Sequence, residues 1–355
     1  MSGRKQHFIP QSLLRGFGLS KGKNTCVVAY THDRGIFTPG TDGIGAEREF
    51  YSELDVEGTG ETLDDKITHY EQNFPTILAQ LRALDDGAPA DTKAAAEFVT
   101  HLVVRNDHFR KTVTTGTEHL VEGMTEAFTD ENQAKALLGL NRERPSDTFT
   151  VEFAKLWAQL GPELAKRGLS EEQFHALAFG AVKSEFPAFF AETVGPLKEM
   201  FGKMVEQVPE VAANAQRSSL ADGLSPPKRV EALSQFEWKV VHPATSVVLP
   251  DCVAVAVDVD GEVYPLMLAE TEKVHTIYMP LSADRLLVGT QGERIEPSAG
   301  INEAFAACSW DFFIARDRTP ELEHCQTLLR KRASQFLVGT IEEVIEEAKA
   351  EHEGK

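Results

Sequence analysis

The sequence predicts an α+β fold in which long central helices pack with a mainly antiparallel sheet formed by N-terminal and C-terminal strands. Short runs rich in β-branched residues lie near both ends of the chain, at 25–38 and at 236–288. Between them, apolar residues recur at spacings of three and four, which is typical of amphipathic helices. A lone two-stranded hairpin is marginally stable in water, so we expect the N-terminal hairpin to join the C-terminal strands.

This pairing of the two ends favours a single interlocked domain over residues 1–355. We divide it into an N-terminal helix and hairpin (1–58), a helical region (59–228), a sheet region (229–318) and a C-terminal acidic helix (319–355). In the first region, residues 8–17 predict a short helix with Pro10 in its first turn. Residues 25–30 and 36–38 predict the two strands of the hairpin.

The helical region contains three predicted segments. Residues 60–84 predict a helix capped by Thr59 and kinked at Pro75. Residues 91–128 predict a second long helix that begins after Asp91. Residues 149–214 continue the helical pattern, with interruptions at Gly161-Pro162, Pro187, Gly195-Pro196 and Pro209. Beyond Ser225-Pro226-Pro227, the predicted elements are strands at 236–241, 246–249, 252–257, 276–279 and 286–288, a turn at 258–261, and helices at 300–308 and 319–350.

Composition limits the class of protein. Of the 355 residues, 42% are hydrophobic and 26% are charged, which is typical of a globular chain. The net charge of −19 repels phosphate groups, so non-specific binding to nucleic acid or to an anionic membrane is disfavoured. No stretch approaches 18 apolar residues and no apolar segment follows the first charges, which predicts neither a membrane span nor a signal peptide.

Four cysteines are scattered along the chain without a Cys-x-x-Cys pair, so their spacing gives no zinc signature. Such sparse cysteines are typical of reduced thiols, and we expect a cytoplasmic protein. The C-terminal segment is rich in glutamate from Glu342 to Glu353. We interpret it as a solvated helix face rather than an acidic interaction tail.

The opening segment Lys5-x-His7-Phe8-Ile9-Pro10-Gln11-x-x-Leu14-x-x-Phe17 resembles the start of the bacterial and fungal domain of unknown function 4238. That family opens with Lys-x-His-x-x-Pro-Gln-x-x-Leu-x-x-Phe. Later elements are similar too: Glu49-Phe50-Tyr51, acidic residues Glu61 and Glu71 on a helix, an arginine helix at 105–110, and Met279-Pro280-Leu281-Ser282. The resemblance implies membership of a family, and it carries no established reaction.

One family element, a Thr-Ser-Asp-x-Pro turn, matches in two ways. Either Thr245-Ser246 keeps its first half and Val247 replaces the aspartate, or Asp251 keeps the acid and the Thr-Ser step is lost. The hydrophobic residues around 248–252 favour the second alignment. The role of this turn stays open between them.

His7 and Gln11 are the first candidate site residues. They are four positions apart, so they share a face if the helix already includes His7. If His7 precedes the first turn, it still lies near the helix N-terminus, where anions are favoured. A histidine there is suited to act as a general base or a metal ligand. The alternative is a pair of hydrogen-bonded residues that fix the N-terminus to the sheet. The His-x-x-Pro step also resembles HNH nucleases, but the Asn and His that those sites need are missing after Phe17.

His101, Arg105 and His108 form a second candidate, because spacings of four and three place them on one face of the predicted helix 91–128. Arg105 is suited to a bidentate contact with a phosphate or carboxylate. The alternative is a polar helix face with a salt bridge to Glu61 or Glu71. Glu49, Glu61, Glu71 and Asp251 supply carboxylates that would suit divalent-metal hydrolysis if they meet His7.

These observations lead to a hydrolase hypothesis. We expect a site built from His7, Gln11, Glu61, Arg105 and Asp251 that acts on a phosphodiester or a nucleotide, with a divalent metal as a candidate cofactor. The rival hypothesis is a non-catalytic binding or regulatory protein with a small-molecule or protein partner, in which the same residues form a structural polar network. A third is a toxin or defence effector with a nucleic-acid target, which the charge of −19 opposes.

Overall fold

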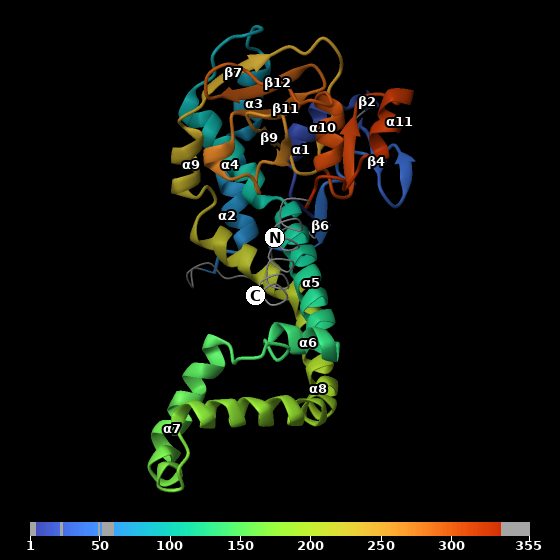
Figure 1. Cartoon of the computed structure of the whole chain (residues 1–355). Coiled ribbons are helices and arrows are strands. Elements are labelled where there is room, and N and C mark those ends of the chain that lie inside the picture. The colour runs from blue at the N-terminus through green and yellow to red at the C-terminus, as the bar shows by residue number, and fades with distance from the viewer. Residues whose placement is uncertain (1–4, 22–23, 49, 52–59, 335–355) are drawn as a thin grey trace. The chain divides into compact units, whose positions relative to one another are not determined.

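The protein has the predicted α+β fold, with antiparallel sheets assembled from both ends of the chain (Figure 1). The computed structural model describes residues 5–21, 24–48, 50–51 and 60–334. Glu49, Thr59 and the glutamates from Glu342 onward, which the sequence analysis singled out, lie outside the described residues.

A four-stranded sheet confirms that the N-terminal hairpin joins C-terminal strands. Its order is β5 (Gly35–Phe37), β4 (Val28–Thr31), β13 (Phe312–Ala315) and β8 (Leu249–Pro250), and its three neighbouring pairs run antiparallel. Tyr30 of β4 pairs with Phe313 of β13, and their rings stack with centroids 4.8 Å apart. In Figure 1, β4 lies beside the helix α11 (Pro320–Gln326). The hairpin thus gains the partner strands that it needs for stability.

A second, five-stranded sheet comes entirely from the C-terminal half. Its order is β10 (Val263–Pro265), β9 (Val255–Val257), β11 (Thr276–Ser282), β12 (Arg285–Thr290) and β7 (Glu237–Val241). The predicted turn at 258–261 joins β9 to β10, as its Asp-Gly step indicates. Two short pairs complete the described strands: β1 (Lys5–His7) with β6 (Ala46–Arg48), and β2 (Leu19–Lys21) with β3 (Asn24–Cys26).

Helices cover these sheets and bury a continuous hydrophobic core that includes Leu13, Phe98, Trp238 and Met279. The helices with described bounds are α1 (Gln11–Leu14), α2 (Leu63–Tyr70), α3 (Phe74–Arg82), α4 (Thr92–Arg105), α5 (His108–Thr129), α6 (Glu131–Leu137), α7 (Asp147–Lys166), α8 (Glu171–Asp222), α9 (Pro227–Leu233), α10 (Ile301–Cys308) and α11 (Pro320–Gln326). Short 3-10 turns are η1 (Arg15–Phe17), η3 (Glu71–Asn73) and η4 (Thr271–Lys273).

Contacts within the chain divide it into two compact units. Unit 1 comprises 1–115 and 209–337, and unit 2 comprises 116–208 and 338–355. Unit 1 holds both larger sheets. The described part of unit 2 is helical and has its own core around Phe153, Phe179 and Phe186. The expectation of one domain over 1–355 stays a prediction.

The predicted helix 91–128 is wrong as a single element. Asp91 caps α4 as predicted, since its carboxylate accepts the N–H of Ala94 at 2.7 Å. The helix ends at Arg105, however, because Asn106 has an extended backbone (φ −65°, ψ 146°). The Asn106 side chain then accepts the N–H of His108 at 2.7 Å and starts α5. His108 therefore begins a new helix and does not continue the face of Arg105.

Other boundaries also differ from the prediction. Thr62 caps α2 through a capping box with Asp65, and Pro75 lies in the first turn of α3, where proline is favoured, and does not kink a continuous helix. The predicted interruptions are absent, since α7 runs through 161–162 and α8 runs through 187, 195–196 and 209. The C-terminal helix ends at Gln326, and turns follow to 334. At the N-terminus, Lys5–His7 form a strand that the sequence did not predict.

Candidate functional site

The first candidate site is an open cleft of about 380 Å³ where β1, α1, α2 and η3 meet. His7 is the last residue of β1, so its ring precedes α1 and still reaches the first turn of that helix. The side chains that matter for its chemistry are His7, Gln11, Arg15, Asp64, Glu71 and Arg105. Three of the five predicted site residues, His7, Gln11 and Arg105, thus line one cleft. We call it the His7 cleft.

A chain of hydrogen bonds fixes the tautomer of His7. Arg15 donates to the side-chain oxygen of Gln11 at 3.2 Å, so the amide nitrogen of Gln11 is the atom that faces His7. This amide nitrogen lies 3.0 Å from Nε2 of His7. An amide N–H can only donate, so Nε2 accepts and carries no proton. The proton is on Nδ1, which is directed to the Gly45 backbone without a well-formed hydrogen bond.

Burial and charge keep this ring neutral. Burial disfavours the charged form of His7, and the nearby positive charge of Arg105 adds to this, so the pKa of His7 falls below its usual value of 6.5. The imidazole is then a free base at neutral pH. Its basic nitrogen lies at the open cleft and is engaged only by the Gln11 amide among the described hydrogen bonds.

Arg105 forms the salt bridge with Glu71 that was the alternative prediction for this helix face. Its side chain is 4% exposed, and it donates to the carboxylate of Glu71 and to the backbone carbonyl of His7. His101 contacts the same Glu71 oxygen at 2.7 Å. The Tyr51 hydroxyl donates to the Arg105 carbonyl at 2.9 Å. Arg105 therefore ties β1 to η3 and α4, and these bonds occupy both of its terminal nitrogens.

Glu71, rather than Glu61, is the acid that lines the His7 cleft and pairs with Arg105. Burial opposes ionisation of Glu71, but the charge of Arg105 and the hydrogen bond from His101 outweigh it and lower its pKa. Glu61 is exposed, precedes the cap residue Thr62, and does not line the cleft. The sequence contained both acids, and nothing in their spacing ranked one above the other.

Asp64 is a cleft residue that sequence reasoning missed. It lies in the first turn of α2 and is half-buried, and burial raises its pKa. Its position directly after Leu63, the first helical residue, was a signal that an acid stands at a helix N-terminus.

Asp251 and His108 lie in a separate, buried cluster. The Asp251 carboxylate accepts the backbone N–H groups of Trp310 (3.0 Å), Asp311 (2.6 Å) and Phe312 (3.1 Å). It is 2% exposed and lies 3.7 Å from Nδ1 of His108. Burial opposes its ionisation, yet these hydrogen bonds and His108 lower its pKa overall. Asp251 does not line the His7 cleft, and its contacts hold the strand β13 in place.

The loop after Asp251 is strained. Val253 is fully buried and has a φ of 68°, a left-handed conformation that is uncommon for a β-branched residue. Surrounding contacts must hold it there, since such a conformation costs about 1–3 kcal/mol. Ala254 N–H to the Cys252 carbonyl (2.8 Å) and Val253 N–H to the Pro250 carbonyl (3.0 Å) close this tight turn.

The chain is similar to a known protein family over most of its length. A family model described as "Protein of unknown function (DUF4238)" matches residues 5–343. The chain belongs to this family. The match confirms the resemblance of the opening motif and extends it over the described parts of both units. No curated protein and no solved structure gives a significant match.

Two further findings bear on the DUF4238 chain. None of the helices in the described ranges is long and apolar enough to cross a membrane. Over the same residues, no group of three or more His, Cys, Asp or Glu side chains is arranged to hold a metal ion. A divalent metal as cofactor stays a prediction.

Proposed function

We propose that this DUF4238 protein is a hydrolase that acts on a phosphodiester or a nucleotide, with His7 as its general base. The observation that carries the proposal is the Arg15–Gln11–His7 chain of hydrogen bonds, which leaves an unprotonated ring nitrogen at an open cleft. A general base must hold a lone pair within hydrogen-bond reach of the proton that it removes. The lowered pKa of His7 keeps this lone pair available at neutral pH.

The reaction follows from the groups in the cleft. A water takes the place of the Gln11 amide at Nε2 of His7 and attacks phosphorus. The new oxygen–phosphorus bond forms as the bond to the leaving oxygen breaks, and the water proton passes to Nε2. Arg15 and Lys5 line the cleft and are exposed, so they are suited to neutralise the phosphoryl oxygens. The leaving oxygen takes its proton from solvent, to which the cleft is open.

The test is hydrolysis of bis(4-nitrophenyl) phosphate and of nucleoside triphosphates by purified protein, with and without added Mg²⁺ or Mn²⁺. We expect His7→Gln to lower kcat by about 100-fold or more, which is the usual contribution of a general base. His69→Gln is the matched control, because His69 is exposed and lies outside the His7 cleft. Equal activity of His7→Gln and wild type would sink the proposal.

A second candidate function is a non-catalytic binding or regulatory protein. The hydrogen bonds of Arg105 and Asp251 favour it, since both residues are engaged in holding backbone segments together. In that case His7→Gln changes stability or partner binding and no hydrolysis is detected. We propose a cytoplasmic location with either function, supported by the four free cysteines of the chain.

A further inference from the structure

A second cleft of about 730 Å³ lies in unit 1, between the N-terminal strands, the start of α5 and the residues around Trp310. Its volume is in the range of small-molecule sites. No described residue lines both this cleft and the His7 cleft. We call it the Lys111 cleft, after the lysine at its centre. Nothing in the proposed hydrolase reaction uses it.

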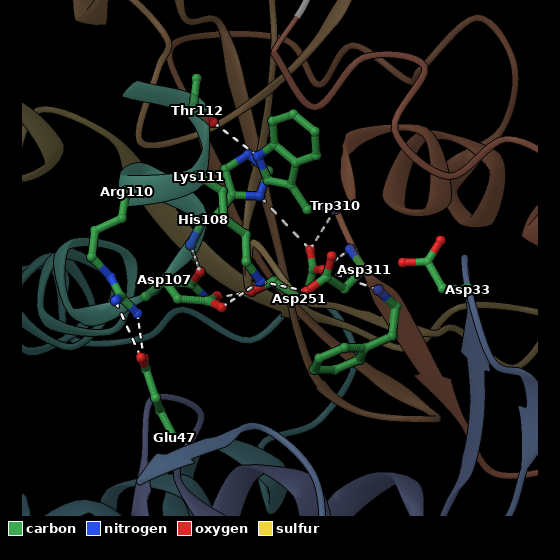
Figure 2. A network of polar contacts seen from close by, with 12 residues as sticks. Asp33, Glu47, Asp107, His108, Arg110, Lys111, Thr112, Asp251, Trp310 and Asp311 are labelled. Atoms are coloured by element: carbon green, nitrogen blue, oxygen red, sulfur yellow. Dashed lines mark hydrogen bonds and ion pairs between the residues drawn. The ribbon is translucent and has the colours of Figure 1, made fainter. Parts of the chain in front are cut away.

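The wall of the Lys111 cleft is a row of alternating charges, much of which can be followed in Figure 2. Lys111 donates to Asp107 at 2.6 Å and also to Asp311. Arg330 continues the row, with contacts to Asp311 (3.4 Å) and Asp33 (3.2 Å).

Arg110 and Glu47 form an ion pair on the other side of Asp107. The guanidinium of Arg110 also lies 3.9 Å from the ring centre of Phe50, which fixes it in place. The row therefore reaches from Glu47 to Asp33 and joins residues that are far apart in the sequence.

The charges in this cleft cancel. The described lining residues include four acids and four bases: Asp33, Glu47, Asp107 and Asp311 against Arg34, Arg110, Lys111 and Arg330. A cleft without net charge gives no advantage to an anion or a cation, because either one would meet acidic and basic groups in equal number. A ligand of zero net charge avoids that repulsion.

The paired groups still have hydrogen-bonding capacity. Each carboxylate offers about four lone-pair sites, and the ion-pair contacts of Glu47 and Asp311 use one at each oxygen. Lys111 has three N–H donors and uses two. The row thus presents spare acceptors and spare donors in alternation. A hydroxyl group can both donate and accept a hydrogen bond at one atom. An uncharged ligand with several hydroxyl groups can therefore bond to the acids and the bases of this row.

Aromatic surface completes the cleft. Phe37 lines it and is 37% exposed, and the half-buried Trp310 lines it as well. Threonines 114 and 115 add hydroxyl groups from α5. An apolar ring face beside fixed polar groups suits a ligand whose own ring has an apolar face and a rim of hydroxyls.

We propose that the Lys111 cleft binds an uncharged sugar, through hydrogen bonds to the alternating Asp, Lys and Arg side chains and stacking on Phe37. This site is distinct from the proposed hydrolytic centre. A sugar bound here would not require His7, and its binding is testable whether or not the protein hydrolyses phosphodiesters.

The experiment is isothermal titration of the full chain with maltose, cellobiose and trehalose, beside glycylglycine as a zwitterion and AMP as an anion. We expect at least one sugar to bind, with an affinity that changes less than about two-fold between 50 and 500 mM NaCl, since salt screens only charged ligands. Phe37→Ala should weaken that binding about ten-fold. Phe189→Ala is the matched control, because Phe189 is exposed (60%) and lies in unit 2.

His7→Gln separates this site from the proposed function, since it should lower kcat for hydrolysis about 100-fold or more and leave sugar binding unchanged. The proposal is wrong if none of the three sugars binds at 10 mM, or if AMP or glycylglycine binds more tightly than every sugar. It is also wrong if Phe37→Ala binds the sugar as well as Phe189→Ala does. Both phenylalanines are exposed, so thermal melting of the two variants should match that of wild type within about 2 °C.

Discussion

Replacing Arg105 with methionine tests whether its ion pair holds the His7 cleft together. The substitution keeps most of the side-chain length and removes the charge. Arg105 is 4% exposed and Glu71 is 16% exposed, so the change leaves a largely buried carboxylate with His101 as its remaining described partner. Removing one member of a buried pair costs about 3–5 kcal/mol. The hydrogen bond to the His7 carbonyl is lost as well.

The assay is urea unfolding followed by tryptophan fluorescence, which reports mainly on unit 1 because Trp238 and Trp310 lie there. We expect the free energy of unfolding to fall by about 3–5 kcal/mol in Arg105→Met and by less than about 0.5 kcal/mol in Arg15→Met, where the side chain is exposed. The double variant Arg105→Met with Glu71→Gln should recover part of the loss, since it leaves no unpaired charge. A cost below about 1 kcal/mol for Arg105→Met, or strict additivity in the double variant, would refute this reasoning.

Three further predictions concern stability. Asp251→Ala should lower the free energy of unfolding by about 3 kcal/mol or more, because three backbone N–H groups lose their acceptor. The control Asp85→Ala, at an exposed residue, should change it by less than about 0.5 kcal/mol. Equal urea midpoints for the two variants would contradict this prediction. The pKa of Glu71 is lowered in the folded state, so the contribution of Glu71 to the free energy of unfolding is full above its usual pKa of 4.5 and is lost as the pH falls further. In a series of urea midpoints measured at decreasing pH, Glu71→Gln should therefore show a smaller loss of stability toward acid pH than wild type. Gly289→Ala should lower the free energy of unfolding by about 1–3 kcal/mol and lower the Tm, because the added methyl group would lie 2.9 Å from the Trp238 ring. An unchanged Tm would show that the ring can move.

The sequence predicted the parts of the fold that depend on local pattern and on general stability rules. The joining of the β4–β5 hairpin to β13 followed from the instability of a lone hairpin. The cap at Asp91 followed from its side chain and from the apolar spacing after it. The match between His7 and Gln11 followed from their spacing, even though His7 lies in a strand.

The rest depends on contacts between distant residues. The break at Asn106 interrupts a segment whose apolar spacing continues, and the Asn106 amide there donates to the Asp251 carbonyl, 145 positions away. Spacing alone placed His108 on the face of Arg105 for this reason. The choice of Glu71 over Glu61 likewise depends on where Arg105 points in the folded chain, and no local pattern encodes that.

The most direct test of the proposed general base is ¹⁵N NMR of the His7 ring in the full chain, recorded as a function of pH. The account predicts the tautomer with its proton on Nδ1 and a titration midpoint below 6.5, because burial and Arg105 disfavour the charged ring. Gln11→Leu should leave the ring neutral but change its Nε2 shift, since the donor to that nitrogen is removed. A proton on Nε2 at neutral pH, or a midpoint at or above 6.5, would contradict the account.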